Sequence, residues 1–366
     1  MKKYEIPNKM KAMVLTGIGT WELQDDVDVP VPGPEEVLCK IGGVAICGSD
    51  PEIIEGGLPG VWPPAYPFIA GHEWAGRVVA VGENVSGFQV GDRVAGEAHK
   101  GCGHCRNCLE GRYTLCFNYG KPETGHRHYG FITNGAYGQY NTYHIKSITK
   151  LPDNVSYMEA AMCDTASVSL HGLELSGIRP GGSVAIIGPG PIGIMAMKLA
   201  FSMGAAKVIM VGRAPRLQTA MDMGCSAAVD FSKENPVEGV LALTDGIGVD
   251  LAVECSGAAG TLEQCIRMCC KGGKVVLLGV AKEGVMEPIP FKHTTHSEIA
   301  IFGSRANPNT CGKVVNLMSS GSLKVKDMVT HTFDLDQIGE AFDTFIGRKD
   351  GAMKVVIYPN SEREEV

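Results

Sequence analysis

The spacing of hydrophobic positions changes near residue 156, and this change predicts two structural regions. Before it, short apolar segments such as GRVVAVG (Gly76–Gly82) and DRVAGEA (Asp92–Ala98) are separated by Gly and Pro, a pattern typical of β-strands. Over Tyr157–Gly177 the apolar residues recur at helical spacing and a glycine closes the run, which predicts a helix. The first region is therefore expected to be rich in β-structure.

Beyond this helix, strand-like and helix-like segments alternate. The expected strands are SVAIIG, KVIMVG, AAVDF, VDLAVECSG and GGKVVLLGV, and the expected helices include Ile192–Met203 and Arg216–Met223. Such alternation is typical of βαβ units around a parallel sheet. After about Gly303 the pattern is mixed again and ends in KVVIYP. The predicted fold class is α/β, with a β-rich domain built from residues 1–158 and 304–366 and a doubly wound dinucleotide-binding domain, residues 159–303, inserted between them.

Composition and charge narrow the classes of partner. The chain has 366 residues and a formal net charge of -7, and its Lys and Arg residues are scattered singly, which argues against nucleic acid or an anionic membrane as the main partner. The segment MKKYEIPNKMKAMVLTG has no secretory h-region or cleavage site. Val184–Met203 carries almost no charge, but its Gly-Pro-Gly-Pro run and Lys198 argue against a membrane span. We therefore expect a cytoplasmic protein whose 13 cysteines are thiols or metal ligands.

A glycine-rich turn predicts the dinucleotide site. The segment Gly188-Pro-Gly190-Pro191-Ile192-Gly193 follows an expected strand and opens an expected helix, which is the context that the GxGxxG pattern requires. Gly188 permits the tight turn, Gly190 lets the backbone approach a pyrophosphate, and Gly193 lets the helix pack on the strand. The helix N-terminus then faces the phosphate charge.

The end of the next expected strand bears on the choice between NAD and NADP. A carboxylate there would bind the ribose hydroxyls of NAD, but the strand ends in Gly212, with Arg213 next and Arg216 close by. Loss of the carboxylate together with added cations favours the 2′-phosphate of NADP. The alternative, in which Arg213 stacks on adenine or points to solvent and the cofactor is NAD, stays open.

Four cysteines within fifteen residues predict a closed metal site. Cys102, Cys105, Cys108 and Cys116 can surround one tetrahedral ion, and sulfur selects zinc or an Fe–S cluster. A fully thiolate-capped zinc has no open position, so we expect a structural zinc that fixes a lobe of about residues 98–120. His104 lies within this lobe and is expected to face solvent.

A second, dispersed set predicts a catalytic metal. Cys47 in CGSD, His72-Glu73 in GHEWAG and Asp164 in MCDTAS each have a structural explanation when taken alone, as core, surface or capping residues. Their joint occurrence with a dinucleotide fold favours a zinc shell of one sulfur, one nitrogen and one oxygen ligand, with the fourth position open to substrate.

These motifs together carry a family resemblance. CGSD, the motif Gly71-His72-Glu73-x-x-Gly76, the segment Val90–Val94, the four-cysteine lobe and the GPGPIG turn resemble, in this order along the chain, the zinc-dependent medium-chain dehydrogenase/reductase family. The match runs from about Lys11 to Tyr358 and looks closest to the sorbitol/polyol and threonine dehydrogenase branch. The resemblance implies that the β-rich domain is GroES-like and catalytic, that the other domain is a Rossmann domain, and that the chain forms a homo-oligomer, a tetramer or a dimer. The implied cofactor contacts are Gly188, Gly190, Pro191, Ile192, Gly193, Gly212, Arg213, Arg216, Gly279 and Val280.

The resemblance also implies roles at the catalytic zinc. Ala161–Gly172 is similar to a helix of the polyol branch where a carboxylate supplies the third ligand, and Asp164 occupies that place. Cys163 would be the ligand if the helix register were shifted, although the following Ser167 and Val168 match the polyol branch. Glu73 is either an orienting residue or a transient fourth ligand.

The implied activity is hydride transfer between a secondary alcohol, expected to be a small polyol, and NAD(P). Zinc would polarise the substrate oxygen and Ser49 would accept its proton. Glu52 stands where the family commonly has a proton-relaying histidine, so it relays the proton instead, or the relay ends at the cofactor ribose. Two alternatives are an NADPH-dependent ketone or aldehyde reductase with the same site, and a nonenzymatic dinucleotide-binding redox sensor, against which the joint presence of the site residues argues.

Overall fold

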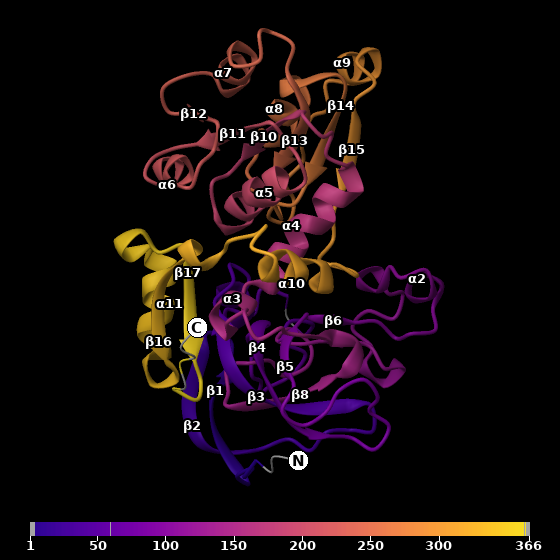
Figure 1. Ribbon diagram of the computed structural model, residues 1–366, viewed down its shortest axis with the longest axis vertical. Helices are drawn as coiled ribbons and strands as arrows, with labels where there is room; N and C mark the ends of the chain where they lie inside the picture. Colours follow the sequence, from indigo (N-terminus) through magenta and orange to yellow (C-terminus); the bar gives the residue numbers. More distant parts are fainter. Residues whose placement is uncertain (1–3, 59, 362, 364–366) are drawn as a thin grey trace. The chain divides into compact units, whose positions relative to one another are not determined.

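The computed structural model describes residues 4–58, 60–361 and 363, so Met1–Lys3 of the N-terminal segment considered above for a secretory signal lie outside it. The chain divides into two compact units (Figure 1). Unit 1 comprises Met1–Asp164 and Cys311–Val366, and unit 2 comprises Thr165–Thr310. The sequence analysis places the corresponding boundaries at 158/159 and 303/304.

Unit 1 is built on a mixed sheet. Its strands run in the order β16-β17-β3-β4-β5-β9, and β8 also pairs with β3. In Figure 1 the yellow β17, from the end of the chain, runs beside indigo strands from its beginning, because β17 pairs antiparallel with β3. The bounds are β3 Glu36–Ala45, β4 Glu73–Val81, β5 Arg93–Gly96, β8 Tyr140–His144, β9 Ile148–Lys150, β16 Val329–Asp334 and β17 Lys354–Tyr358, with a separate hairpin of β1 Lys9–Gly17 and β2 Thr20–Asp28 and a short pair of β6 His99–Lys100 and β7 Arg127–His128.

The core of unit 1 lies against this sheet. Apolar side chains such as Val37, Ile41 and Val78 are fully buried, as are the rings of Trp74 and Tyr143, which stack with their centroids 3.8 Å apart. Such ring pairs add about 0.5–1.5 kcal/mol beyond the burial of their area. The helices of unit 1 are α1 Asp50–Ile54, α2 Arg106–Leu109, α3 Tyr157–Ala160, α10 Cys311–Ser319 and α11 Ile338–Gly347, and α4 Cys163–Ser176 begins there before continuing into unit 2.

Unit 2 is a parallel sheet with helical connections. Its strand order is β12-β11-β10-β13-β14-β15, and each neighbouring pair is parallel. The order reverses between β10 and β13, which in doubly wound sheets marks the crevice where ligands bind. The bounds are β10 Ser183–Ile187, β11 Lys207–Gly212, β12 Ala227–Asp230, β13 Val249–Glu254, β14 Cys269–Leu277 and β15 Ala300–Gly303, with helices α5 Pro191–Ser202, α6 Arg216–Asp222, α7 Pro236–Ala242, α8 Thr261–Met268 and α9 Phe291–His296.

The long helix expected over Tyr157–Gly177 is interrupted. Helix α3 starts with a capping box between Ser156 and Glu159 and ends at Ala160, and α4 starts again at Cys163. The residues of the break, Ala161 and Met162, are fully buried. Hydrophobic spacing did not reveal the break, because apolar residues continue through it. Among the described residues, no helix has the length and apolar character needed to cross a bilayer.

Candidate catalytic and metal sites

Three side chains from two segments of unit 1 form the candidate catalytic metal site. Cys47 follows β3 and precedes α1, His72 immediately precedes β4, and Glu73 is the first residue of β4. One potential ligand atom from each lies within 4.8 Å of the others. Strand pairing brings them together, because Ala45 near the end of β3 is paired with Glu73. A sulfur, a nitrogen and an oxygen donor fit zinc with one coordination position left for a substrate.

Asp50 contacts both Cys47 and His72 of this site. Its carboxylate accepts hydrogen bonds from the backbone N–H of Cys47 and the hydroxyl of Tyr137, both at 2.7 Å. Its other oxygen lies 3.5 Å from Nδ1 of His72. A carboxylate at one ring nitrogen leaves the other nitrogen for a metal.

The negative charge of the groups around His72 favours the binding of a cation. Burial by itself lowers the pKa of His72, but attraction to Cys47 and Asp50 outweighs burial and raises the pKa well above its usual value. In the metal-free protein the proton on His72 therefore provides the positive charge that these groups attract. A divalent ion bound by the same groups would satisfy that need instead.

Glu73 has a second partner. Its carboxylate forms a buried ion pair with Nζ of Lys354, the first residue of β17, and both side chains are 2% exposed. Burial lowers the pKa of Lys354, but Glu73 and Cys47 outweigh this effect, so the pKa is raised and the lysine stays charged. Lys354 thus offsets one of the negative charges gathered at the site.

Asp164 and Cys163 do not belong to the group within 4.8 Å, as judged over the described residues. The buried Asp164 carboxylate accepts a hydrogen bond of 3.4 Å from the backbone of Ala98. The sulfur of Cys163 lies 3.0 Å from that of Cys311. Among the described residues, the candidate ligand group that contains Cys47 and His72 has Glu73 as its carboxylate.

Ser49 precedes α1 and Glu52 lies within it, shortly after Cys47 in the chain. Ser49 occupies the N-cap position but makes no side-chain capping bond, and its hydroxyl oxygen is buried without a hydrogen-bond partner among the described residues. An N-cap serine ordinarily accepts a backbone hydrogen bond, so this hydroxyl is left available for another proton partner. Glu52 is exposed to solvent three residues further along.

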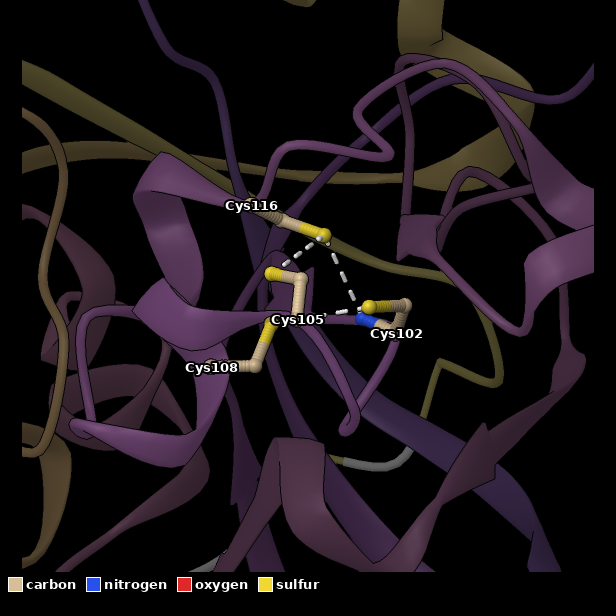
Figure 2. Close-up of side chains that lie close together, drawn as sticks. All are labelled: Cys102, Cys105, Cys108 and Cys116. Atoms are coloured by element: carbon tan, nitrogen blue, oxygen red, sulfur yellow. Dashed lines mark hydrogen bonds between the residues drawn. The ribbon is translucent and has the colours of Figure 1, made fainter.

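The four cysteines of the predicted lobe face one another (Figure 2). Their sulfurs lie within 4.8 Å of one another, and the pairs Cys102–Cys108 and Cys105–Cys116 are each 3.9 Å apart. Four sulfurs at about 2.3 Å from one tetrahedral ion would be about 3.8 Å apart. The measured spacing therefore fits a single zinc ion. His104 is not in this group, and its Nδ1 lies 3.1 Å from the backbone oxygen of Cys102.

Local hydrogen bonds prepare this lobe for thiolates. Burial raises the pKa of Cys102, but the backbone N–H of His104 and the amide of Asn118 outweigh it and lower the pKa to about 6. Burial raises the pKa of Cys108 to about 12. Some thiols are thus ready to ionise and others need a cation, which is the expected state of a site that closes around a metal.

The predicted dinucleotide turn lies at the carboxyl end of β10. Gly188 has a φ of +100°, and Gly190 is the N-cap of α5, whose first residues are Pro191 and Ile192. A Cβ built at Gly193 would lie 2.0 Å from the backbone oxygen of Gly188, so only glycine lets α5 approach the strand. This arrangement provides the backbone N–H groups and helix terminus that bind a pyrophosphate.

The remaining predicted cofactor residues follow other strands of the same sheet. Gly212 ends β11, and a Cβ there would lie 2.5 Å from the ring of Pro189, so the Gly-Pro turn itself excludes an acidic side chain at this position. Arg213 is exposed, and Arg216 begins α6 with its guanidinium 3.5 Å from a Cβ built at Gly190. Gly279 and the 91% exposed Val280 follow β14.

Comparison with known proteins agrees with this geometry. Residues 33–153 match the alcohol dehydrogenase GroES-like domain, and residues 191–320 match the zinc-binding dehydrogenase domain. The sorbitol dehydrogenase of Bacillus subtilis (strain 168) is 34% identical over 359 residues, which cover 98% of this chain and 99% of that enzyme. The chain belongs to the zinc-binding dehydrogenase family. The expectation of a medium-chain dehydrogenase of the polyol branch, with a GroES-like and a Rossmann domain, is confirmed.

Two further relatives place the enzyme more closely. The L-threonine 3-dehydrogenase of Idiomarina loihiensis is 35% identical, with 93% of this chain and 96% of that enzyme covered. A protein from Sinorhizobium meliloti 1021 described as a zinc-binding dehydrogenase, whose crystal structure holds NADP, has a TM-score of 0.87 and 32% identity over 96% of this chain and 100% of that chain. The enzyme is therefore a zinc-dependent oxidoreductase of alcohols that uses a nicotinamide cofactor.

Sequence reasoning missed three residues of the site: Asp50, Tyr137 and Lys354. Asp50 could have been found, because it is the last residue of the CGSD motif already selected. Lys354 left only a weak signal, as a single charge at the start of an apolar strand. Tyr137 left none, since an aromatic residue in a glycine-rich segment has many uses.

Proposed function

We propose that the enzyme oxidises a small polyol or a related secondary alcohol with NADP, using a zinc ion held by Cys47, His72 and Glu73. The observation that carries this proposal is the group formed by those three side chains, whose donor atoms lie within 4.8 Å of one another and number one fewer than a tetrahedral zinc binds. The similarity to sorbitol dehydrogenases over nearly the whole chain supports a polyol as the substrate class.

The residues around the metal have distinct tasks in this proposal. When bound, zinc supplies a Lewis acid that lowers the pKa of an oxygen it contacts by several units. The Ser49 hydroxyl accepts the alcohol proton, and Glu52 carries it to solvent, unless the relay ends at the cofactor ribose. Asp50 orients His72, and the positive charge of Lys354 offsets the negative charge of Glu73.

Zinc content separates the two candidate carboxylate ligands. Replacing Cys47 by Ala, or Glu73 by Gln, is expected to abolish turnover and release the catalytic zinc while NADP binding persists. The matched variant Asp164→Asn should keep this zinc. Loss of zinc from Asp164→Asn with zinc retained in Glu73→Gln would restore Asp164 as the ligand, as the family resemblance implies. Full activity of Cys47→Ala would refute the site altogether.

We propose a second, structural zinc at Cys102, Cys105, Cys108 and Cys116, giving two zinc ions per chain. The sulfur spacing of 3.9 Å supports it. Metal analysis of purified enzyme should give two equivalents of zinc per chain. A total of one equivalent, lost in a Cys105→Ser variant that still folds, would contradict the assignment of two zinc ions.

The cofactor preference rests on Gly212, Arg213 and Arg216. No carboxylate fits at Gly212, so the ribose has no acidic partner there, and the two arginines supply charge for a 2′-phosphate. Arg213→Ala should weaken NADP and leave NAD nearly unchanged. Equal effects on both cofactors would support adenine stacking and NAD as the cofactor instead.

The same site would catalyse the reverse reaction, reduction of a ketone or aldehyde with NADPH, and the features that favour NADP also favour this direction. A screen of C3–C6 polyols, threonine and simple ketones with both cofactors, with zinc measured on the same sample, distinguishes the alternatives. Turnover of none of these alcohols or ketones by zinc-loaded protein would favour a dinucleotide-binding sensor.

We further propose a cytoplasmic homo-oligomer, a dimer or tetramer. Unit 2 exposes Met286 (89%), Ile289 (49%) and Phe291 (81%), and apolar side chains gathered in this way commonly meet another copy. The 13 cysteines without a disulfide support a reducing compartment. The molar mass is measured by light scattering after size-exclusion chromatography. A monomer mass would refute the oligomer.

A further inference from the structure

Two buried cysteines outside both metal sites lie almost in bonding contact. Cys163 is the first residue of α4 and Cys311 is the first residue of α10, 148 positions apart in the chain. Their sulfurs are 3.0 Å apart, whereas the sulfur pairs in the four-cysteine lobe are 3.9 Å apart. A disulfide bond measures about 2.0 Å, so its formation would bring the two sulfurs about 1 Å closer together.

The position of this pair in the chain is unusual. Unit 1 ends at Asp164 and resumes at Cys311, so the two cysteines flank the whole of unit 2, and both belong to unit 1. A bond between them would close one covalent loop that contains residues 165–310. Neither sulfur is in the groups that could hold a metal among the described residues.

We propose that Cys163 and Cys311 form an oxidation-sensitive dithiol, which peroxide converts to a disulfide that closes this loop. The sulfur of Cys311 attacks the O–O bond of hydrogen peroxide, becomes a sulfenic acid and releases one water. The sulfur of Cys163 then displaces the second water and forms the S–S bond. Two thiols and one peroxide give one disulfide and two waters.

The order of attack follows from exposure. Cys311 is 3% exposed and Cys163 is 0% exposed, so the first reaction is assigned to Cys311. Cys163, at 3.0 Å, captures the sulfenic acid before a second peroxide can oxidise it further. The pKa of Cys311 is raised by the hydrogen bond with Cys163 and by burial, so the reaction is slower than that of a surface thiolate.

The experiment uses the full-length, zinc-loaded enzyme. It is treated with increasing hydrogen peroxide, unfolded in N-ethylmaleimide, and digested without reduction for mass spectrometry. The expected product is one linked peptide pair containing Cys163 and Cys311, two hydrogens lighter than the free peptides and lost on treatment with dithiothreitol. Zinc is measured in parallel, so that the assay stays below the peroxide level that damages the four-cysteine lobe.

A gel gives a second readout. When a protease cuts the oxidised enzyme between residues 165 and 310, the fragments should stay joined on a nonreducing gel and separate after reduction. Both Cys163→Ser and Cys311→Ser should abolish this, and Cys39→Ser, which removes another fully buried cysteine of unit 1, should not. If a serine variant does not fold, as judged by circular dichroism, the alanine variant replaces it.

Two results would overturn the proposal. One is complete maleimide labelling of both cysteines at peroxide levels that already oxidise the other buried thiols. The other is a linked pair that persists in Cys311→Ser, because the disulfide would then join different cysteines.

Discussion

The buried ion pair between Glu73 and Lys354 is the sharpest test of how the site is supported. Both side chains are 2% exposed, and Lys354 also donates a hydrogen bond of 3.3 Å to the backbone oxygen of Ile46, next to Cys47. Replacing Lys354 by Met keeps most of the volume but removes the charged partner of the buried Glu73 carboxylate. Removing one partner of such a pair typically costs about 3–5 kcal/mol, and we expect this loss for Lys354→Met.

A double-mutant cycle separates the ion pair from packing. Glu73→Gln should also destabilise unit 1, because it leaves the ammonium unpaired. The double variant should lose at least about 2 kcal/mol less than the sum of the two single variants, since neither charge is then left alone. Lys9→Met is the matched control, because its pair with Asp28 is exposed and solvent screens it, so its loss should change the free energy of unfolding little.

Tryptophan fluorescence during urea unfolding measures these changes where they occur. The three tryptophans, Trp21, Trp62 and Trp74, all lie in unit 1, so their signal reports the unit that holds the pair. All four proteins of the cycle are compared after removal of the catalytic zinc, because Glu73→Gln is expected to release this metal and metal loss would lower stability by another route. A cost below about 1 kcal/mol for Lys354→Met, or strictly additive costs in the cycle, would refute the reasoning.

Three further perturbations have defined outcomes. Cys105→Ser should release the structural zinc and lower the melting temperature while the folded fraction keeps its turnover, and native melting without activity would contradict the structural role. Burial, helped by Arg127 and Lys100, lowers the pKa of His126 from 6.5 to about 4, so the unfolded chain takes up a proton first as the pH falls. This protonation should remove roughly 3 kcal/mol of stability between pH 6.5 and 4, and His126→Leu should flatten that part of the pH profile of urea unfolding. Gly212→Asp should weaken NAD and NADP alike because its Cβ would meet Pro189 at 2.5 Å, whereas adding Pro189→Ala should favour NAD in titrations, and unchanged NADP affinity of the single variant would argue against the clash.

Features that lie within short stretches of chain could be predicted from the sequence alone. The four cysteines are separated by three, three and eight positions, so a single loop can bring them around one ion whatever the rest of the fold does. The GPGPIG turn was equally readable, because a strand, a glycine turn and a helix N-terminus are consecutive in the chain. The alternation of strands and helices predicted the parallel sheet for the same reason, although helices α7 and α8 were not specified.

Contacts between residues that are distant in the chain could be found only in the tertiary structure. Cys47 meets His72 and Glu73, which are neighbours in the chain, because β3 and β4 are paired in a register that no local pattern encodes. Lys354 is buried against Glu73, 281 positions away, although a lone lysine beginning a strand is ordinarily exposed. Cys163, which the sequence suggested only as a competing zinc ligand, instead faces Cys311. Such long-range contacts depend on the packing of whole helices and strands. The sequence shows which residue types are compatible with such a contact but not which residues will make it.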